Sequence, residues 1–118
     1  MNDQTAVRAV VEEYVAASVA RDVARLKAIF HPQALMSGYL QDQKMVGSVQ
    51  PLYDFLQQQQ ADTSGKHRWE IPVLEVTGSI AYVTLTEKNF FGMNFTTYFH
   101  LMKLDGSWKI VSKLFTTV

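Results

Sequence analysis

Two side chains in this sequence could share proton-transfer chemistry in an enclosed site, Tyr14 near the N-terminus and His100 near the C-terminus. A histidine that faces a cavity can donate, accept or shuttle protons near neutral pH. A tyrosine in the interior can present its hydroxyl as a hydrogen-bond donor. The structural alternative for both is a core tyrosine with a backbone partner and a half-buried histidine without a role.

Periodicity indicates that the two residues could meet. Tyr14 lies on the same helical stripe as Val7 and Val11, and His100 lies on the same strand face as Tyr98 and Met102. If the helical stripe packs into the concave side of a bent sheet, both side chains border one cavity within about 10 Å of each other. The expected ligand-binding set is Tyr14, Met36, Trp69, Asn89, Tyr98, His100 and Met102.

Other kinds of site are disfavoured. The chain has no cysteine, which removes thiolate nucleophiles, disulfides and the usual structural zinc sites. His31, His67 and His100 are too far apart in the sequence to form a ligand pair, so no metal site and no cofactor are expected. The six glycines stand singly at turns, without a phosphate-binding loop. A formal net charge of zero gives no reason to bind nucleic acid.

The N-terminal third has a helical pattern. We expect a first helix over residues 5–20 with Asp3 as its N-cap, then a shorter helix capped by Asp22 and ended by Pro32. Two short strands, Ala34 to Leu40 and Lys44 to Gly47, should follow. Ser48 should then cap a third helix, whose buried stripe is Leu52, Phe55 and Leu56.

The C-terminal half has the pattern of an antiparallel meander. Four long strands are expected, His67 to Thr77, Ile80 to Phe91, Met93 to Leu104 and Trp108 to Thr117, separated by Gly78-Ser79, Gly92 and Asp105-Gly106. Both faces of the sheet are apolar in sequence, so the helices cover one face and a second copy of the chain is the simplest cover for the other. We assign Phe95, Phe99 and Leu101 to that outer, dimer-forming face.

Taken together, the helical opening VVEEYVAA, RDV and LKAIFHP and the closing segment FTTYFHLMKLDGSWKIVSKLF resemble the nuclear transport factor 2-like superfamily. Within it the chain is most similar to the "Putative lumazine-binding" family, which is related to the SnoaL-like polyketide cyclases. The resemblance covers nearly the whole chain, and we expect residues 1–118 to form one domain. It implies an α+β, cystatin-like cone: N-terminal helices packed in a strongly curved, mainly antiparallel sheet, with an apolar cavity at the open end and dimerisation through the outer sheet face.

The resemblance also implies roles for the candidate residues. In the related steroid isomerases a tyrosine at the place of Tyr14 donates to a developing oxyanion, as in the known ketosteroid isomerase case. A second donor, an acid in those enzymes, lies near the position of His100. Their aspartate base falls at or near Gly38, and the stretch from Ala34 to Tyr39 contains no carboxylate. Steroid-type isomerisation is therefore disfavoured.

Three functions remain open at this point. The leading hypothesis is a homodimeric pocket protein for an apolar, partly polar small molecule. The second is a cofactor-independent acid–base enzyme of cyclase, dehydratase or isomerase type that uses His100 with Tyr14. The third is a structural dimerisation module with a filled core. The N-terminal residues lack a secretory pattern and no apolar run is long enough to cross a membrane, so we expect a cytoplasmic protein without membrane or nucleic-acid partners.

Overall fold

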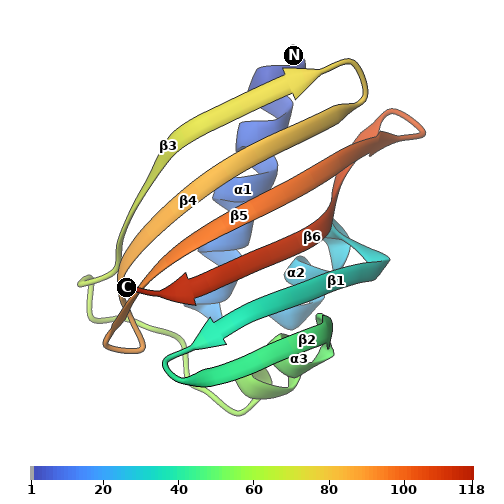
Figure 1. Cartoon of the computed structure of the whole chain (residues 1–118). Helices are drawn as coiled ribbons and strands as arrows, with labels where there is room; N and C mark the ends of the chain where they lie inside the picture. Colours follow the sequence, from blue (N-terminus) through green and yellow to red (C-terminus); the bar gives the residue numbers. More distant parts are fainter. Residues whose placement is uncertain (1) are drawn as a thin grey trace.

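The computed structural model describes residues 2–118, which form three helices and a six-stranded sheet (Figure 1). The helices are α1 (Asp3–Ala20), α2 (Val23–Ile29) and α3 (Gln50–Gln57). The strands are β1 (Phe30–Leu40), β2 (Gln43–Ser48), β3 (Arg68–Thr77), β4 (Ile80–Phe90), β5 (Met93–Leu104) and β6 (Ser107–Thr117). Their order is β2-β1-β6-β5-β4-β3, and all neighbours are antiparallel except the pair β1 and β6. The predicted α+β architecture is confirmed.

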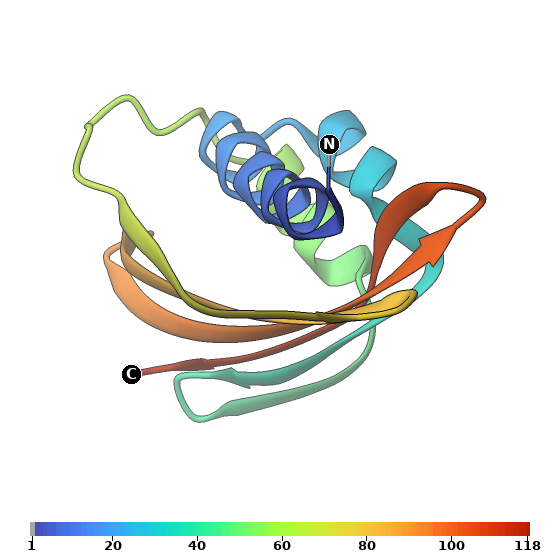
Figure 2. The ribbon, with the colours of Figure 1, turned by 90° about the horizontal axis from the view of Figure 1, so that it is seen from above.

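The sheet is open and curved, and the three helices lie on its concave side (Figure 2). The core fills the space between them. It includes Val7 and Val11 of α1, Leu26 of α2 and Phe99 of β5, none of which is more than 2% exposed. Within residues 2–118, no helix combines the length and the apolar character that a membrane span requires.

Helix α1 begins two residues earlier than predicted because a different side chain caps it. Asn2, not Asp3, occupies the N-cap, and its Oδ1 accepts a hydrogen bond from the Thr5 N–H at 2.8 Å. The Asp3 carboxylate instead accepts hydrogen bonds from Trp108 Nε1 and Lys103 Nζ. These bonds tie the start of α1 to the β5–β6 hairpin. The predicted cap at Asp22 is confirmed, since its Oδ1 accepts from the Arg25 N–H.

Helix α3 differs from the prediction in its cap and in its buried face. Val49 holds the N-cap position, while Ser48 Oγ accepts a hydrogen bond from the Gln50 N–H at 3.2 Å. Leu52 and Leu56 are buried as expected, but Phe55 is 46% exposed and Tyr53 is buried in its place. Phe55 packs edge-on against Phe91 in the turn between β4 and β5, with ring centroids 4.8 Å apart.

Gly38 of β1 lies directly against the backbone of β6. The two strands run parallel, with Gly38 opposite Phe115, and a Cβ built on Gly38 would overlap the Phe115 carbonyl oxygen. Gly38, at or near which the family resemblance places the aspartate of the steroid isomerases, therefore has no room for a side chain in this protein.

The assignment of faces on β5 was wrong. Phe95, Phe99 and Leu101, expected on the outer face, point to the concave side and are buried. Tyr98 and His100 lie on the convex face and are exposed. A slip of one residue exchanges every side chain between faces, and the two apolar faces of this strand gave no clear sign of the correct parity. The helices cover the concave face, where the Tyr14 ring packs edge-on against Phe99 with ring centroids 4.9 Å apart.

Candidate functional site

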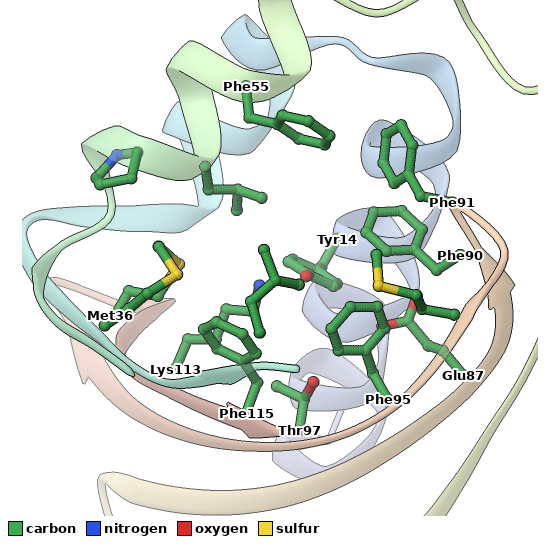
Figure 3. A pocket seen from close by; sticks show the side chains of 15 residues that line it. Tyr14, Met36, Phe55, Glu87, Phe90, Phe91, Phe95, Thr97, Lys113 and Phe115 are labelled. Atoms are coloured by element: carbon green, nitrogen blue, oxygen red, sulfur yellow. The ribbon is translucent and has the colours of Figure 1, made fainter. Parts of the chain in front are cut away.

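A cavity of about 110 Å³ lies between α1, α3 and the concave face of the sheet (Figure 3). Most of its wall is apolar and comes from Met36, Leu40, Met45, Pro51, Leu52, Phe55, Phe90, Phe91, Met93, Phe95 and Phe115. Since a single water needs only roughly 10–15 Å³, the cavity has room for a small organic molecule. A concave wall of aromatic rings and methionines with a few polar groups is typical of small-molecule sites.

Four polar side chains complete the wall, each from a different element: Tyr14 from α1, Glu87 from β4, Thr97 from β5 and Lys113 from β6. Strand alternation brings the last three to the concave side. Lys113 is opposite Phe99 and Met36 in the register, and Glu87 is opposite Phe95. Polar groups from three neighbouring strands and a helix thus converge on one apolar space (Figure 3).

Lys113 is a buried lysine without an anionic partner. The residue is 6% exposed, and no carboxylate of residues 2–118 forms an ion pair with it. Its Nζ lies 5.3 Å from the centroid of the Tyr14 ring and 4.9 Å from that of Phe115. Burial lowers the pKa of Lys113 from 10.5 to about 8, and the negative charge of Glu87 opposes this effect.

Glu87 is buried, at 3% exposure, and pairs with a histidine behind the cavity wall. Its Oε2 shares a hydrogen bond of 2.8 Å with His67 Nε2, and the His67 side chain is 8% exposed. The imidazole also packs against Phe90, with ring centroids 5.8 Å apart. A buried carboxylate and a buried imidazole therefore form a pair whose carboxylate belongs to the cavity.

Tyr14 is 1% exposed and is held by edge-on contacts with Phe30 and Phe99. Burial raises the pKa of its hydroxyl well above 10, and the nearby charge of Glu87 adds to the rise. The hydroxyl therefore stays protonated and can only act as a donor or a neutral acceptor near neutral pH. Figure 3 shows its oxygen pointing toward the middle of the cavity.

Beside the hydroxyls of Tyr14 and Thr97, the polar atoms of the cavity wall include Lys113 Nζ and Glu87 Oε1. Neither Lys113 Nζ nor Glu87 Oε1 forms a hydrogen bond within residues 2–118. In this part of the chain, the side-chain polar atom that lacks both a partner and accessible surface is Ser18 Oγ. The lysine and carboxylate atoms therefore keep accessible surface, which the cavity provides because both residues line it. A bound molecule could contact both.

The sequence-predicted site residues do not come together as expected. Tyr14 and Met36 line the cavity, but His100, Tyr98 and Met102 lie on the opposite, convex face of the sheet. The prediction that Tyr14 and His100 border one cavity is wrong, for the reason of strand parity given above. A proton-transfer pair of these two residues is therefore excluded by their placement.

Two further expected lining residues also lie outside the cavity wall. Trp69 is half-buried on β3 and packs at the margin of the core. Asn89 is exposed near the end of β4, where its Nδ2 donates to the Lys66 carbonyl oxygen at 3.1 Å. Both were expected at the cavity mouth, which Phe55 and Phe91 form instead. The Arg21 guanidinium lies 4.0 Å from the centroid of the Phe91 ring and supports that side of the mouth.

Sequence reasoning missed Lys113, Glu87 and His67. Glu87 could have been found, because the alternation of Ala81, Val83 and Leu85 places it on the inward face. Lys113 could not be found in the same way. A register irregularity between His100 and Leu101 of β5 shifts the alternation of β6, so that Ile110 and Lys113 both face inward.

Residues 2–116 match the model of the family described as "Putative lumazine-binding". A curated relative, "Aldolase FrzH" of a Cladobotryum species, is 33% identical over 115 residues, which are 97% of this chain and 90% of that protein. A solved NTF2-like (nuclear transport factor 2-like) protein of Silicibacter pomeroyi is 28% identical, with a TM-score of 0.87 over 97% of this chain and 94% of its own. An NTF2-like protein of Shewanella baltica has a TM-score of 0.86 at 24% identity, covering 97% of this chain and 92% of its own.

Proposed function

This chain belongs to the family described as "Putative lumazine-binding", within the NTF2-like fold, and we propose that its cavity is the site of a cofactor-independent enzyme acting on a small apolar carbonyl compound. The proposed reaction class is formation or cleavage of a carbon–carbon bond next to the carbonyl, through an imine on Lys113. The observation that carries the proposal is the buried amine of Lys113, unpaired with any anion of residues 2–118 and open to an apolar cavity.

A lysine amine attacks a carbonyl carbon only in its neutral form. With a pKa of about 8, Lys113 is roughly one-tenth neutral at pH 7, about 300-fold more than a lysine with the ordinary value. Desolvation in a hydrophobic pocket is one of the established ways in which a lysine becomes a nucleophile. The environment of Lys113 therefore supports imine chemistry.

The chemical steps balance without a cofactor. The neutral amine of Lys113 adds to the carbonyl carbon, and the carbonyl oxygen takes up the proton that the new ammonium nitrogen releases, with the Tyr14 hydroxyl as a suitable relay. The resulting hydroxyl group takes a second proton from solvent and leaves as water, which gives an iminium ion on Lys113. Removal of a proton from the neighbouring carbon gives an enamine, whose carbon can bond to the carbonyl carbon of a second molecule. Hydrolysis restores the free lysine and releases a hydroxy ketone.

The curated relative supports this reaction class. The protein named "Aldolase FrzH" is similar to this chain over nearly the full length of both, and an aldolase joins or splits two carbonyl compounds. The apolar wall favours substrates that consist of a carbonyl group on a hydrocarbon skeleton. Charged sugar phosphates would find one cation, Lys113, and no arginine on this wall.

Noncovalent binding in the same cavity is the second candidate, favoured by the high share of apolar residues in its wall. A neutral or weakly acidic apolar ligand would fill the cavity and leave the amine unreacted. In that case the ligand raises the stability of the folded chain, but no bond to Lys113 forms.

Reductive trapping separates the two candidates. The chain is incubated with cyclohexanone and sodium cyanoborohydride, which converts an imine into a stable secondary amine, and the product is examined by intact mass and peptide mapping. We expect one cyclohexyl group, located on Lys113, and none on that peptide in Lys113→Met. Lys88→Met removes an exposed lysine of β4 and should leave the labelling unchanged. Labelling that is equal in the wild type and Lys113→Met would contradict the enzyme proposal.

A further inference from the structure

We propose that Glu87 is the base that removes the α-proton of the imine on Lys113, and that His67 is the residue that positions its carboxylate. This inference rests on the proposed imine chemistry. It assigns a base to the removal of the α-proton, the step for which Lys113 and Tyr14 supply none. It places the base on β4, at a distance from the β1 position at which the related isomerases hold theirs.

The first support is convergence in one cavity. Glu87 and Lys113 both face the concave side, from β4 and β6, which are separated by β5 alone. The negative charge of Glu87 is close enough to act on the protonation of both Lys113 and Tyr14. A small molecule bound covalently to Lys113 Nζ within a cavity of about 110 Å³ therefore lies beside the Glu87 carboxylate.

The second support is that the two carboxylate oxygens of Glu87 have different surroundings. Oε2 is held by His67 Nε2 at 2.8 Å, while Oε1 has no partner among residues 2–118 and is open to the cavity. A carboxylate fixed by one oxygen and free at the other has a defined direction for accepting a proton. Fixed orientation of the base is a large part of what enzymes contribute to proton transfer.

The third support is the lack of another carboxylate in the cavity. The polar residues of its wall are Tyr14, Glu87, Thr97 and Lys113. Tyr14 and Thr97 are too weakly acidic to be ionised near neutral pH, and Lys113 is occupied by the imine. At Gly38 a side chain would overlap the Phe115 carbonyl oxygen. Among the described residues of the wall, Glu87 alone supplies an anionic base.

The step is a simple transfer of one proton. The α-carbon of the iminium gives its proton to Glu87 Oε1, the C–H electron pair becomes the carbon–carbon double bond of the enamine, and the former C=N pair stays on the lysine nitrogen. Glu87 is then a neutral acid, and it returns the proton to the alkoxide that forms when the enamine adds to a second carbonyl. No oxidant or reductant is needed.

Proton exchange measures this step separately from imine formation. Cyclohexanone is incubated with the chain in D₂O, and NMR follows the loss of its α-protons, while a parallel sample is trapped with cyanoborohydride. In Glu87→Gln we expect trapping on Lys113 to persist and exchange to fall by about 100-fold or more, a typical effect of losing a general base. Lys113→Met gives the background exchange rate, and Glu75→Gln, an exposed carboxylate on β3, is the matched control.

Different outcomes contradict the imine chemistry and the role of Glu87. Absence of trapping in the wild-type chain contradicts the imine chemistry itself. Trapping with an unchanged exchange rate in Glu87→Gln contradicts the role of Glu87 and leaves the imine chemistry standing. If Glu87→Gln does not fold, Glu87→Asp keeps the charge and withdraws the oxygen from the cavity, so the same loss of exchange, by about tenfold or more, is expected there. Wild-type exchange in Glu87→Asp contradicts the proposal.

The role of His67 is tested by comparing two variants that differ in whether they can donate a hydrogen bond to Glu87. His67→Gln keeps a side-chain N–H that can donate to Glu87 Oε2, whereas His67→Leu does not. We expect exchange per trapped molecule to be retained within a few-fold in His67→Gln and to fall by tenfold or more in His67→Leu. The other charged or titratable groups that face Glu87, Tyr14 of α1 and Lys113 of β6, are unchanged in both variants. Equal exchange in the two variants would contradict a positioning role.

Discussion

Replacing Lys113 by methionine should stabilise the fold while abolishing the proposed chemistry. The lowering of the Lys113 pKa from 10.5 to about 8 corresponds to roughly 3 kcal/mol by which the folded state disfavours the charged amine. Methionine has a similar length, fits an apolar cavity and carries no charge. We therefore expect the free energy of unfolding at pH 7 to rise by about 1–3 kcal/mol, and Tm to rise by roughly 5–10 °C.

The stability difference between Lys113→Met and the wild type should depend on pH in a way that identifies the Lys113 amine as its cause. The folded pKa lies below the unfolded value, so between about pH 8 and 10.5 the unfolded wild-type chain binds more protons than the folded chain. Wild-type stability should therefore rise relative to Lys113→Met through this window, and the advantage of the variant should shrink toward zero. Other groups titrate in both chains and largely cancel in the difference.

Urea denaturation followed by tryptophan fluorescence at pH 7, 8, 9 and 10 measures this difference. Lys88→Met is the control, because Lys88 is exposed and its loss should change stability by less than about 0.5 kcal/mol at every pH. A Lys113→Met variant that is less stable than wild type at pH 7, or a difference that does not vary with pH, would refute the reasoning. Either result would mean that the amine is well solvated or firmly paired in the folded chain.

Three more predictions concern the rest of the molecule. The convex face exposes Ile80, Tyr98 and Leu114 at 58%, 42% and 49%, so we propose that it forms a dimer interface: the chain should sediment as a dimer at micromolar concentration and Leu114→Glu as a monomer, and a monomeric wild type would contradict this. Gly38→Ala should lower the free energy of unfolding by about 2–4 kcal/mol in denaturant titration because its Cβ would overlap the Phe115 backbone, whereas an unchanged midpoint would show that β1 moves away at little cost. Phe55→Ala should widen the cavity mouth, so that trapping of 4-phenyl-2-butanone accelerates relative to cyclohexanone by at least several-fold, and an unchanged ratio would place the entrance elsewhere.

Local signals predicted the elements of this fold well. The turn at Asp105-Gly106 and the cap at Asp22 each act over a few residues, and each lies at an element boundary in the structure. The break predicted at Pro32 does not: α2 ends at Ile29, and Pro32 lies inside β1. The parallel pairing of β1 with β6 was not predicted. It joins segments about 75 residues apart, and no turn or spacing near either strand specifies it. The family resemblance, which rests on both ends of the chain, was needed to predict the overall architecture.

The site was harder to predict than the fold because its chemistry depends on strand parity. On β5 both faces are rich in apolar side chains, so alternation alone could not tell Phe99 from His100 as the inward residue. The choice of His100 then placed the proton-transfer chemistry on the wrong side of the sheet. On β4 the alternation is clear and places Glu87 inward. A buried carboxylate indicates a site only when a second buried charged group, here Lys113, is known to lie nearby.

Burial of Lys113 and Glu87 in one apolar cavity links the stability cost to the proposed reaction. An iminium ion on Lys113 beside the Glu87 carboxylate is a pair of opposite charges in a poorly solvating space. Transfer of the α-proton converts both groups into neutral species, the enamine and the carboxylic acid. Because burial penalises charged forms, the cavity favours the neutral side of this step more than water does. The same desolvation that lowers the pKa of Lys113 therefore also favours enamine formation, and Lys113→Met should recover the stability only by losing the reaction.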